Sequence, residues 1–276
     1  MNFYKYHGLG NDFIIMDNRR NNINLSKEDI IVLCNRNFGI GADGILLAEN
    51  SKEQDIKMTI YNSDGSQAEM CGNATRCFAK YLYEKDIVKK PIINIETLAG
   101  VIIPELEIKN GIVANIKVDM GKPVFEAKDI PCNINEKAAI NVSVEIDSIE
   151  YVITAVLMGV PHVVIFKDKL VDEEIIKEGK MIEVSDYFPL KTNVNFVKIL
   201  NRQEIVVRTW ERGAGYTLAC GTGSCASVAA GIINGLLDNR VLVHLRGGDL
   251  VIYWDGKNNI FMEGVATEVF SGKVNI

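Results

Sequence analysis

The sequence lacks several features that would assign it to a specialised class. Of its 276 residues only 6 are proline, against 23 glycine, while 47% are hydrophobic and 24% are charged. This composition excludes disordered, collagenous and coiled-coil chains and is typical of a globular protein. Basic residues are not in excess either, because 30 Lys and Arg stand against 36 Asp and Glu, for a net charge of −6. No nucleic-acid partner is therefore indicated, and a small molecule is the expected ligand.

Long hydrophobic runs are also missing. The longest apolar stretch, residues 151–166, is interrupted by Pro161 and His162, and it is shorter than the ~20 residues of a membrane-spanning helix. The first seven residues do not show the charged, apolar and small-residue segments of a signal peptide. We therefore expect no membrane partner and a cytoplasmic protein with reduced cysteines.

The common motifs of metal and cofactor sites are absent as well. The six cysteines form no Cys-x-x-Cys and the three histidines are scattered, so we expect no metal. No P-loop, Gly-x-Ser-x-Gly or His-Glu-x-x-His motif occurs, which removes the commonest NTPase, hydrolase and metalloprotease hypotheses. Residues 39–44 satisfy Gly-x-Gly-x-x-Gly, but they precede a strand-like segment instead of following one. They predict a tight loop and not a dinucleotide site.

Short apolar runs with a period of two dominate the chain and predict strands. These runs are residues 13–16, 45–47, 58–61, 92–97, 112–120, 151–157, 195–199 and 205–210. Turn signals such as Lys109-Asn110-Gly111 separate many of them and favour antiparallel hairpins over βαβ crossovers. Helical patterns occur at residues 26–35, with Ser26 as the N-cap, and at 73–84, 172–179 and 222–237. The predicted class is α+β.

Two similar motifs lie about half the chain length apart. Cys71-Gly72-Asn73-Ala74 and Cys220-Gly221-Thr222-Gly223 each open a predicted helix, which suggests two similar halves with a boundary near residues 115–120. With Asn73 and Thr222 as N-caps, each leading cysteine lies just outside a helix start. The unsatisfied N–H groups and the helix dipole there favour a thiolate. Cys77 and Cys225 lie inside the helices and are expected to be inert.

Two reactive thiols at helix starts suit one kind of catalysis. The helix starts can jointly bind an anion such as an α-carboxylate. One thiolate can remove the α-proton while the opposite thiol supplies a proton to the other face, which inverts the stereocentre without a cofactor. The motifs thus predict an amino-acid racemase or epimerase. The alternatives are buried structural cysteines and a non-catalytic amino-acid-binding or thiol redox protein.

Along nearly its whole length the sequence resembles the diaminopimelate epimerase family. The matching motifs are residues 7–13, 39–44, 62–66, 69–76, 161–162, 192–196 and 210–223. The resemblance implies two pseudo-symmetric domains, each a curved, mostly antiparallel sheet around a central helix. One domain would comprise residues 1–117 with a returning strand at 262–276, and the other residues 118–261. It also implies a cofactor-independent isomerase that forms a homodimer.

The same resemblance assigns roles to individual residues. Cys71 and Cys220 would be the acid/base pair, and His162 and Glu211 would tune their pKa values. The residues implied to line the cavity at the reacting end of the substrate are Asn11, Gly72, Asn73, Gly221 and Thr222. Those implied to grip the distal end of diaminopimelate are Asn62, Asn193 and Arg212.

Three positions depart from the family's pattern. Val160 stands where the family has Asn, Tyr216 where Glu is usual, and Ala74 where Gly is common. Replacing a buried hydrogen-bonding group by an apolar one can change selectivity by orders of magnitude. We therefore expect Val160 and Tyr216 to contact the substrate and to favour another amino acid, such as histidine, with diaminopimelate as the alternative. An isomerase of the related phenazine-biosynthesis type is disfavoured, because that group lacks the thiol pair.

Overall fold

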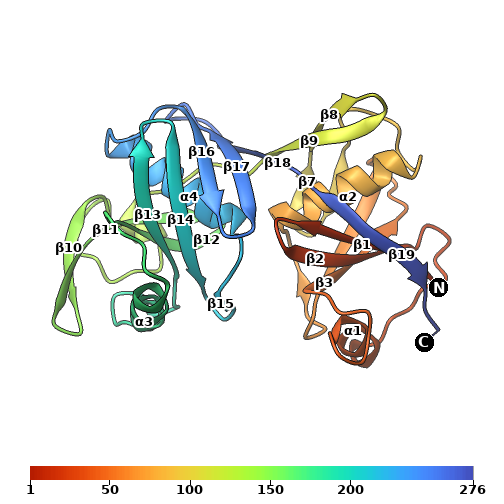
Figure 1. Ribbon diagram of the computed structural model, residues 1–276, viewed down its shortest axis with the longest axis horizontal. Coiled ribbons are helices and arrows are strands. Elements are labelled where there is room, and N and C mark those ends of the chain that lie inside the picture. Colours follow the sequence, from red (N-terminus) through yellow and green to blue (C-terminus); the bar gives the residue numbers. More distant parts are fainter. Residues whose placement is uncertain (276) are drawn as a thin grey trace. The chain divides into compact units, whose positions relative to one another are not determined.

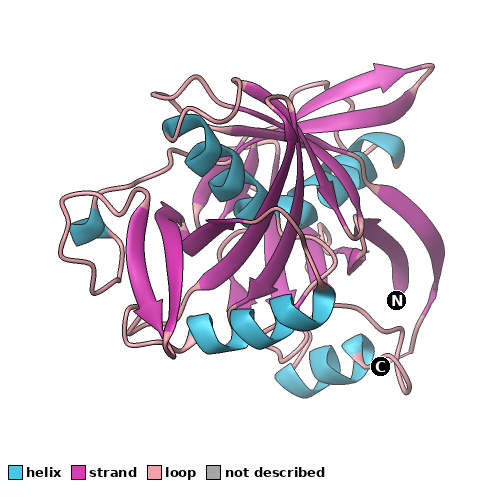
Figure 2. Cartoon of the chain, turned by 60° about the vertical axis from the view of Figure 1, so that its left-hand side comes forward, coloured by secondary structure: helices cyan, strands magenta, loops and turns pink. Residues whose placement is uncertain are grey.

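The computed structural model describes residues 1–275 and divides the chain into two compact units. Unit 1 consists of Met1–Asp119 and Glu263–Ile276, and unit 2 consists of Met120–Met262. Strands make up most of the regular structure (Figure 2), with helices between them. The predicted α+β class is confirmed.

Unit 1 is built from a sheet around one central helix, α2 (Gly72–Glu84) (Figure 1). Its strand order is β19-β1-β2-β3-β4-β6-β7, with β5 paired to β4. These strands are β1 Asn2–Gly8, β2 Asn11–Asp17, β3 Gly44–Glu49, β4 Ile56–Asn62, β5 Gln67–Ala68, β6 Ile95–Thr97, β7 Gly100–Ile102 and β19 Thr267–Lys273. A hairpin of β8 (Glu105–Lys109) and β9 (Ile112–Asp119) also packs in this unit. α2 is buried from Gly72 to Leu82, and it packs against β1, β2, β9 and β19.

Unit 2 repeats this arrangement around α4 (Gly221–Ile233). Its strands follow the order β10-β11-β12-β13-β14-β16-β17, with β15 paired to β14. They are β10 Val142–Ile146, β11 Ile149–Met158, β12 Val160–Phe166, β13 Asn193–Asn201, β14 Glu204–Glu211, β15 Gly215–Tyr216, β16 Arg240–Leu245 and β17 Gly248–Tyr253. A short 3-10 turn, Ala127–Asp129, precedes β10, and β18 (Phe261–Gly264) leads the chain out of the unit. The largest core side chains include Phe188 and Phe196.

Each α-helix of residues 1–275 lies in a connection between two parallel strands. The parallel pairs are β2 with β3, β4 with β6, β12 with β13, and β14 with β16. The connecting helices are α1 (Lys27–Cys34), α2, α3 (Asp172–Glu183) and α4, respectively. The predicted preference for hairpins was therefore wrong at these four places, because turn residues report local reversals and not which distant strand completes a pair. The order strand, helix, strand, strand, short strand, helix, strand, strand occurs once in each unit.

Some predicted elements keep their positions in the structure and others have different boundaries. Ser26 caps α1, as predicted, and the structure adds a capping box with Asp29. Residues 39–43 lie in a loop between α1 and β3, in which Gly41 has a φ of +79°, and Gly44 already begins β3. The predicted strand at 92–97 shortens to Ile95–Thr97, because Ile92 follows Pro91 and makes only an isolated bridge. None of the helices described here is long and apolar enough to cross a membrane.

Candidate active site

Cys71 begins the central helix of unit 1. Its backbone is extended (φ −149°, ψ 119°) and its carbonyl accepts the Thr75 N–H at 2.9 Å, so Cys71 itself is the N-cap of α2. The prediction that Asn73 is the cap was wrong, because the Asn73 side chain is held elsewhere. Its Nδ2 donates to Asn11 Oδ1 at 3.0 Å, and its Oδ1 accepts from Arg76 Nη2 at 2.9 Å. Cys71 Sγ lies 3.8 Å from the same Asn11 oxygen and donates to it.

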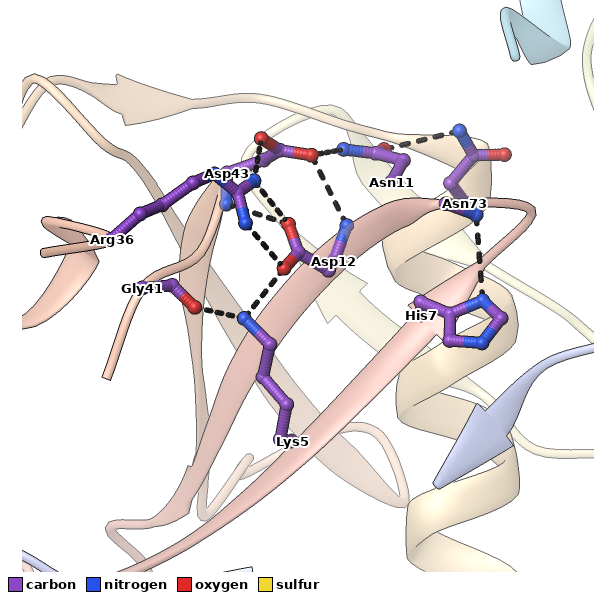
Figure 3. Close-up of polar contacts among 9 residues, drawn as sticks. Lys5, His7, Asn11, Asp12, Arg36, Gly41, Asp43 and Asn73 are labelled. Carbon is purple, nitrogen blue, oxygen red and sulfur yellow. Dashed lines mark hydrogen bonds and ion pairs between the residues drawn. The ribbon is translucent and has the colours of Figure 1, made fainter. Parts of the chain in front are cut away.

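A charged network around Asp12 and Asp43 sets the direction of the Asn11 amide (Figure 3). Asn11 Nδ2 donates to Asp43 Oδ2 at 2.8 Å, and Asp43 accepts a further bond from Arg36 at 2.8 Å. Arg36 also binds both oxygens of Asp12, at 2.8 and 3.0 Å, and Lys5 Nζ lies 2.6 Å from Asp12. Because a carboxylate only accepts, Asp43 draws the NH₂ group of Asn11 and leaves its oxygen facing Cys71.

The Asp12 carboxyl group is ionised in this network although it is half-buried. Burial raises its pKa, but hydrogen bonds from Arg36 and Lys5 outweigh burial and hold the pKa below the ordinary range. Asp12 is thus ionised at neutral pH and balances the buried Lys5 ammonium. The predicted site residues of unit 1 that come together are Asn11, Cys71, Gly72 and Asn73. Asn62 ends β4 and donates to Ser66 Oγ at 3.0 Å across a turn.

Cys220 begins the central helix of unit 2 in the same way. Its carbonyl accepts the Ser224 N–H at 2.9 Å, which makes Cys220 and not Thr222 the N-cap of α4 and corrects the second predicted cap. Here the sulfur completes the cap, because Gly223 N–H donates to Sγ at 3.4 Å. The Thr222 hydroxyl lies 3.5 Å from the same sulfur. Gly221 is the first residue of the helix.

The resting state of Cys220 differs from the expected thiolate. The residue is only 4% exposed. Burial raises the pKa of the Cys220 thiol well above its ordinary value, and the charge of Glu211 raises it further. The bonds from Thr222 and Gly223 lower the pKa by less. We therefore expect Cys220 to be a thiol at neutral pH without substrate, and not the thiolate that the helix start predicts, because burial raises its pKa by more than the bonds from Thr222 and Gly223 lower it.

His162 and its neighbours form a second polar group in unit 2. The His162 ring is fully buried in β12, and burial, followed by the charge of Arg212, lowers its pKa to about 3, so the ring is neutral. Asn193 lies across the strand pair from His162, donates to Pro161 O at 3.0 Å and accepts the Arg212 backbone N–H at 2.9 Å. Its side chain therefore ties two backbone segments together. The Arg212 guanidinium donates to Leu190 O at 3.1 Å.

Val160 and Tyr216, expected to line the substrate pocket, are both half-buried. The Tyr216 hydroxyl donates to Asp172 Oδ1 at 2.7 Å, and the Arg246 guanidinium lies 4.4 Å from the ring centroid. Burial, with the bond to Asp172, raises the pKa of Tyr216 to about 12. Val160 begins β12 opposite Met158, across the tight turn at Gly159. The Tyr216 hydroxyl thus has a structural partner at the start of α3.

Three polar residues of these two groups were not singled out by sequence reasoning. Arg76 is fully buried, Asp43 holds Asn11, and Asn195 is fully buried beside His162. Asn195 and Arg76 stand inside the motifs that carried the family resemblance, but only their burial shows what they contact. Among residues 1–275 no cluster of three or more His, Cys, Asp or Glu side chains could hold a metal ion.

A family profile described as "Diaminopimelate epimerase" matches residues 3–126 and 154–269, which is most of the chain. The chain belongs to the diaminopimelate epimerase family. Curated relatives named "Diaminopimelate epimerase" agree with this along their whole length. One from Pelotomaculum thermopropionicum is 48% identical over 99% of this chain and 98% of its own. Another from Caldanaerobacter subterraneus subsp. tengcongensis is 48% identical over 100% of each chain, and one from Methanococcus maripaludis strain C5 is 43% identical over 100% of each.

Solved structures of other proteins share this fold at low sequence identity. A phenazine biosynthesis protein of the PhzF family from Bacillus anthracis has a TM-score of 0.70 and 16% identity, covering 100% of this chain and 99% of that chain. A probable proline racemase from Agrobacterium radiobacter K84 has a TM-score of 0.69 and 15% identity, covering 100% and 93%. These likenesses confirm the fold. With the family membership, the chain is an isomerase of the racemase and epimerase type.

Proposed function

We propose that this chain is a diaminopimelate epimerase, which inverts one Cα of LL-diaminopimelate to give the meso form without a cofactor. The observation that carries the proposal is the repeated helix start, with Cys71 and Cys220 each the N-cap of a buried central helix. The substrate is inferred from the relatives of that name, which are up to 48% identical over nearly the whole chain. A cytoplasmic homodimer belongs to the same proposal, and analytical ultracentrifugation would test the dimer.

The relatives support diaminopimelate better than the histidine-like substrate that the sequence first favoured. That expectation depended on Val160 and Tyr216, whereas the relatives described above are named diaminopimelate epimerase. The bond from Tyr216 to Asp172 gives the tyrosine a structural role. Of the two departures, Val160 then remains the one that bears on the substrate.

In the proposed mechanism one cysteine is a thiolate and the other a thiol in each turnover. The thiolate takes the α-proton as the Cα–H bond breaks, and the electron pair is delocalised into the substrate's carboxylate. The S–H bond of the opposite thiol then breaks as a new Cα–H bond forms on the other face. The two cysteines have exchanged protonation states, so the reverse reaction uses the same atoms with their roles exchanged.

The neighbours of each sulfur suit this exchange. Gly223 N–H and the Thr222 hydroxyl both lie within 3.5 Å of Cys220 Sγ, so they partly offset the burial that favours a thiol and stabilise the thiolate that forms during turnover. Asn11 Oδ1 faces Cys71 and accepts its S–H, which stabilises a thiol. The helix-start N–H groups at Gly72 and Gly221 are suited to the negative charge that develops on the carboxylate.

Solvent exchange tests the proposal directly. Reduced protein in deuterium oxide is incubated separately with LL-diaminopimelate, meso-lanthionine and L-histidine, and loss of the α-proton signal is followed by NMR. We expect exchange with diaminopimelate, abolished in Cys71→Ala and Cys220→Ala. Full turnover by both variants would refute the two-base mechanism. Ligand binding without any exchange would instead favour the non-catalytic binding protein.

Val160→Asn separates the two substrate hypotheses within the same assay. If the enzyme acts on diaminopimelate and Val160 is a neutral replacement, the variant should exchange diaminopimelate at a rate similar to the unmodified protein. If the unmodified protein exchanges histidine and not diaminopimelate, and the variant gains diaminopimelate exchange, the proposed substrate is wrong. The replacement at Val160 would then have redirected the enzyme.

A further inference from the structure

Asn195 occupies a fully buried position in β13 and contacts three neighbouring segments of unit 2. Its Nδ2 lies 3.1 Å from Val163 O and 3.2 Å from His162 Nδ1. Its Oδ1 accepts the Thr209 hydroxyl of β14 at 3.0 Å. Each polar atom of the amide thus has a partner, as a buried amide requires.

The Val163 carbonyl fixes the orientation of this amide and, through it, the tautomer of His162. A carbonyl oxygen only accepts, so the Asn195 atom that faces it must be the NH₂ group. The same NH₂ group faces His162 Nδ1, which must therefore accept its second hydrogen. A neutral imidazole that accepts at Nδ1 carries its proton at Nε2. His162 is neutral because burial lowers its pKa to about 3.

The same Asn195 amide packs against the first turn of α4. A Cβ built on Gly223 would lie 2.4 Å from Asn195 Oδ1 and 3.2 Å from Cys220 Sγ. Only a glycine at this place in the first turn lets the amide approach this closely. Asn195 therefore connects the tautomer of His162 to the turn whose N–H group donates to the Cys220 sulfur.

The donor that results has no acceptor among residues 1–275. His162 is fully buried, and its Nε2 has no hydrogen-bond partner in this part of the chain. A buried N–H group without a partner is unfavourable, and such groups are found where a ligand supplies the missing acceptor. The chemistry of the proposed reaction supplies one, because its substrate carboxylate becomes more negative as the α-proton leaves.

We propose that Asn195 is a positioning residue that holds His162 as the neutral Nε2–H tautomer, so that His162 donates a hydrogen bond to the substrate carboxylate and does not act as a base. The role assigned to His162 rests on the proposed function. The tautomer rests on the geometry of Asn195 alone. Val163, Thr209 and Gly223 hold the amide, and His162 presents the donor.

The tautomer is measured by ¹⁵N NMR of the protein labelled at its three histidines. The signals of His162 are assigned by their loss in His162→Gln. We expect Nε2 protonated and Nδ1 unprotonated at pH 7, with the ring still neutral at pH 5. A proton on Nδ1, or an imidazolium at pH 6, would overturn the proposal whatever the substrate is.

Two variants at the Asn195 amide and its partner Thr209 form a matched pair. Thr209→Val removes the hydroxyl that donates to Asn195 but leaves the Val163 carbonyl in place, so we expect the tautomer to be unchanged. Asn195→Asp places a carboxylate against Nδ1, which moves the proton to Nδ1 or makes the ring an imidazolium. We expect kcat to fall by about 10²-fold to 10³-fold in Asn195→Asp, the usual effect of losing one preorganised donor. An Asn195→Asp protein that keeps both the Nε2–H signal and its activity would refute the assignment.

Substitution of His162 itself distinguishes a donor from a base. Gln offers an N–H group at the place of Nε2 but cannot take up a proton, whereas Leu offers neither. We expect His162→Gln to retain kcat within about tenfold and His162→Leu to lose about 10²-fold or more. Equal losses in both variants would show that His162 acts as a base or only packs. If no amino acid exchanges its α-proton, the proposed function fails while the NMR result still decides the tautomer.

Discussion

Replacing Asp12 by Asn tests whether the charged network around Asp12 and Asp43 stabilises unit 1. The substitution preserves the shape of the side chain but removes the charge that balances Lys5 and Arg36. Lys5 has a side chain that is 7% exposed, against 14% for Asp12 and 57% for Arg36. Without the carboxylate, the Lys5 ammonium is left with neutral acceptors, such as the Gly41 carbonyl. A poorly solvated charge is then left without a counter-charge.

The expected cost follows from the burial of this pair. Removing one partner of a buried ion pair typically destabilises a protein by about 3–5 kcal/mol. We expect a loss of about 3 kcal/mol, the lower end of this range, because Asp12 keeps some contact with water and Arg36 is mostly solvated. The matched control is Asp17→Asn, whose partner Arg19 is 37% exposed and which is itself 39% exposed. Such a surface pair contributes about 0–1 kcal/mol.

The effect has a definite dependence on pH. The pKa of Asp12 is lower in the folded protein than the ordinary value, so its contribution is fully present above the unfolded pKa of about 3.9. It is lost as the pH falls through the lower folded pKa. The difference between wild type and Asp12→Asn should therefore be constant from about pH 5 to pH 8 and shrink below about pH 4.

The two units can be observed separately in one urea titration. Trp210 and Trp254 both lie in unit 2, so tryptophan fluorescence reports the unfolding of that unit. Amide hydrogen exchange in α2 reports unit 1. We expect Asp12→Asn to lower protection in α2 while leaving the fluorescence transition in place. The reasoning fails if Asp12→Asn is no more destabilising than Asp17→Asn, or if the difference persists unchanged at pH 3.

Three further results are expected. Because burial, followed by the charge of Glu211, raises the pKa of Cys220, its alkylation by iodoacetamide without substrate should keep accelerating well above pH 9, whereas an ordinary thiol levels off. Gly223→Ala should abolish α-proton exchange in a folded protein, since the new Cβ would lie 2.4 Å from Asn195 Oδ1; retained activity would contradict the close approach. Gly179→Ala should destabilise unit 2 by about 1–3 kcal/mol in the fluorescence transition, because the added Cβ would lie 2.5 Å from Trp210 Cβ, and an unchanged midpoint would show that α3 shifts freely.

The elements with a local cause could be predicted from the sequence. The capping box at Ser26 and Asp29 and the α+β class depend on residues a few positions apart, and the structure has both. The helix starts at Cys71 and Cys220 were placed only to within two residues. Their exact caps depend on where the side chains of Asn73 and Thr222 bind, and Asn73 binds Asn11, far away along the chain.

The parallel strand pairs and the buried polar contacts could not be predicted in this way. Turn residues indicate hairpins. The parallel pairing of β12 with β13 instead depends on α3, which connects the two strands, and on where that helix packs. Likewise, Asp43 and Asn195 lie inside motifs that carry the family resemblance, but the sequence does not show what their side chains contact. Their roles appear only when Asn11 or His162 is seen beside them.

The amino-acid sequence thus determined the α+β class and the two helices that begin at cysteines. The motifs around those helices also determined the family. Tertiary structure decided the direction in which the pKa of Cys220 is shifted. A helix start by itself favours a thiolate at Cys220, yet burial and Glu211 make it a thiol. The reason is that short-range hydrogen bonding follows neighbours in the sequence, whereas desolvation and charge depend on every atom that folding brings near.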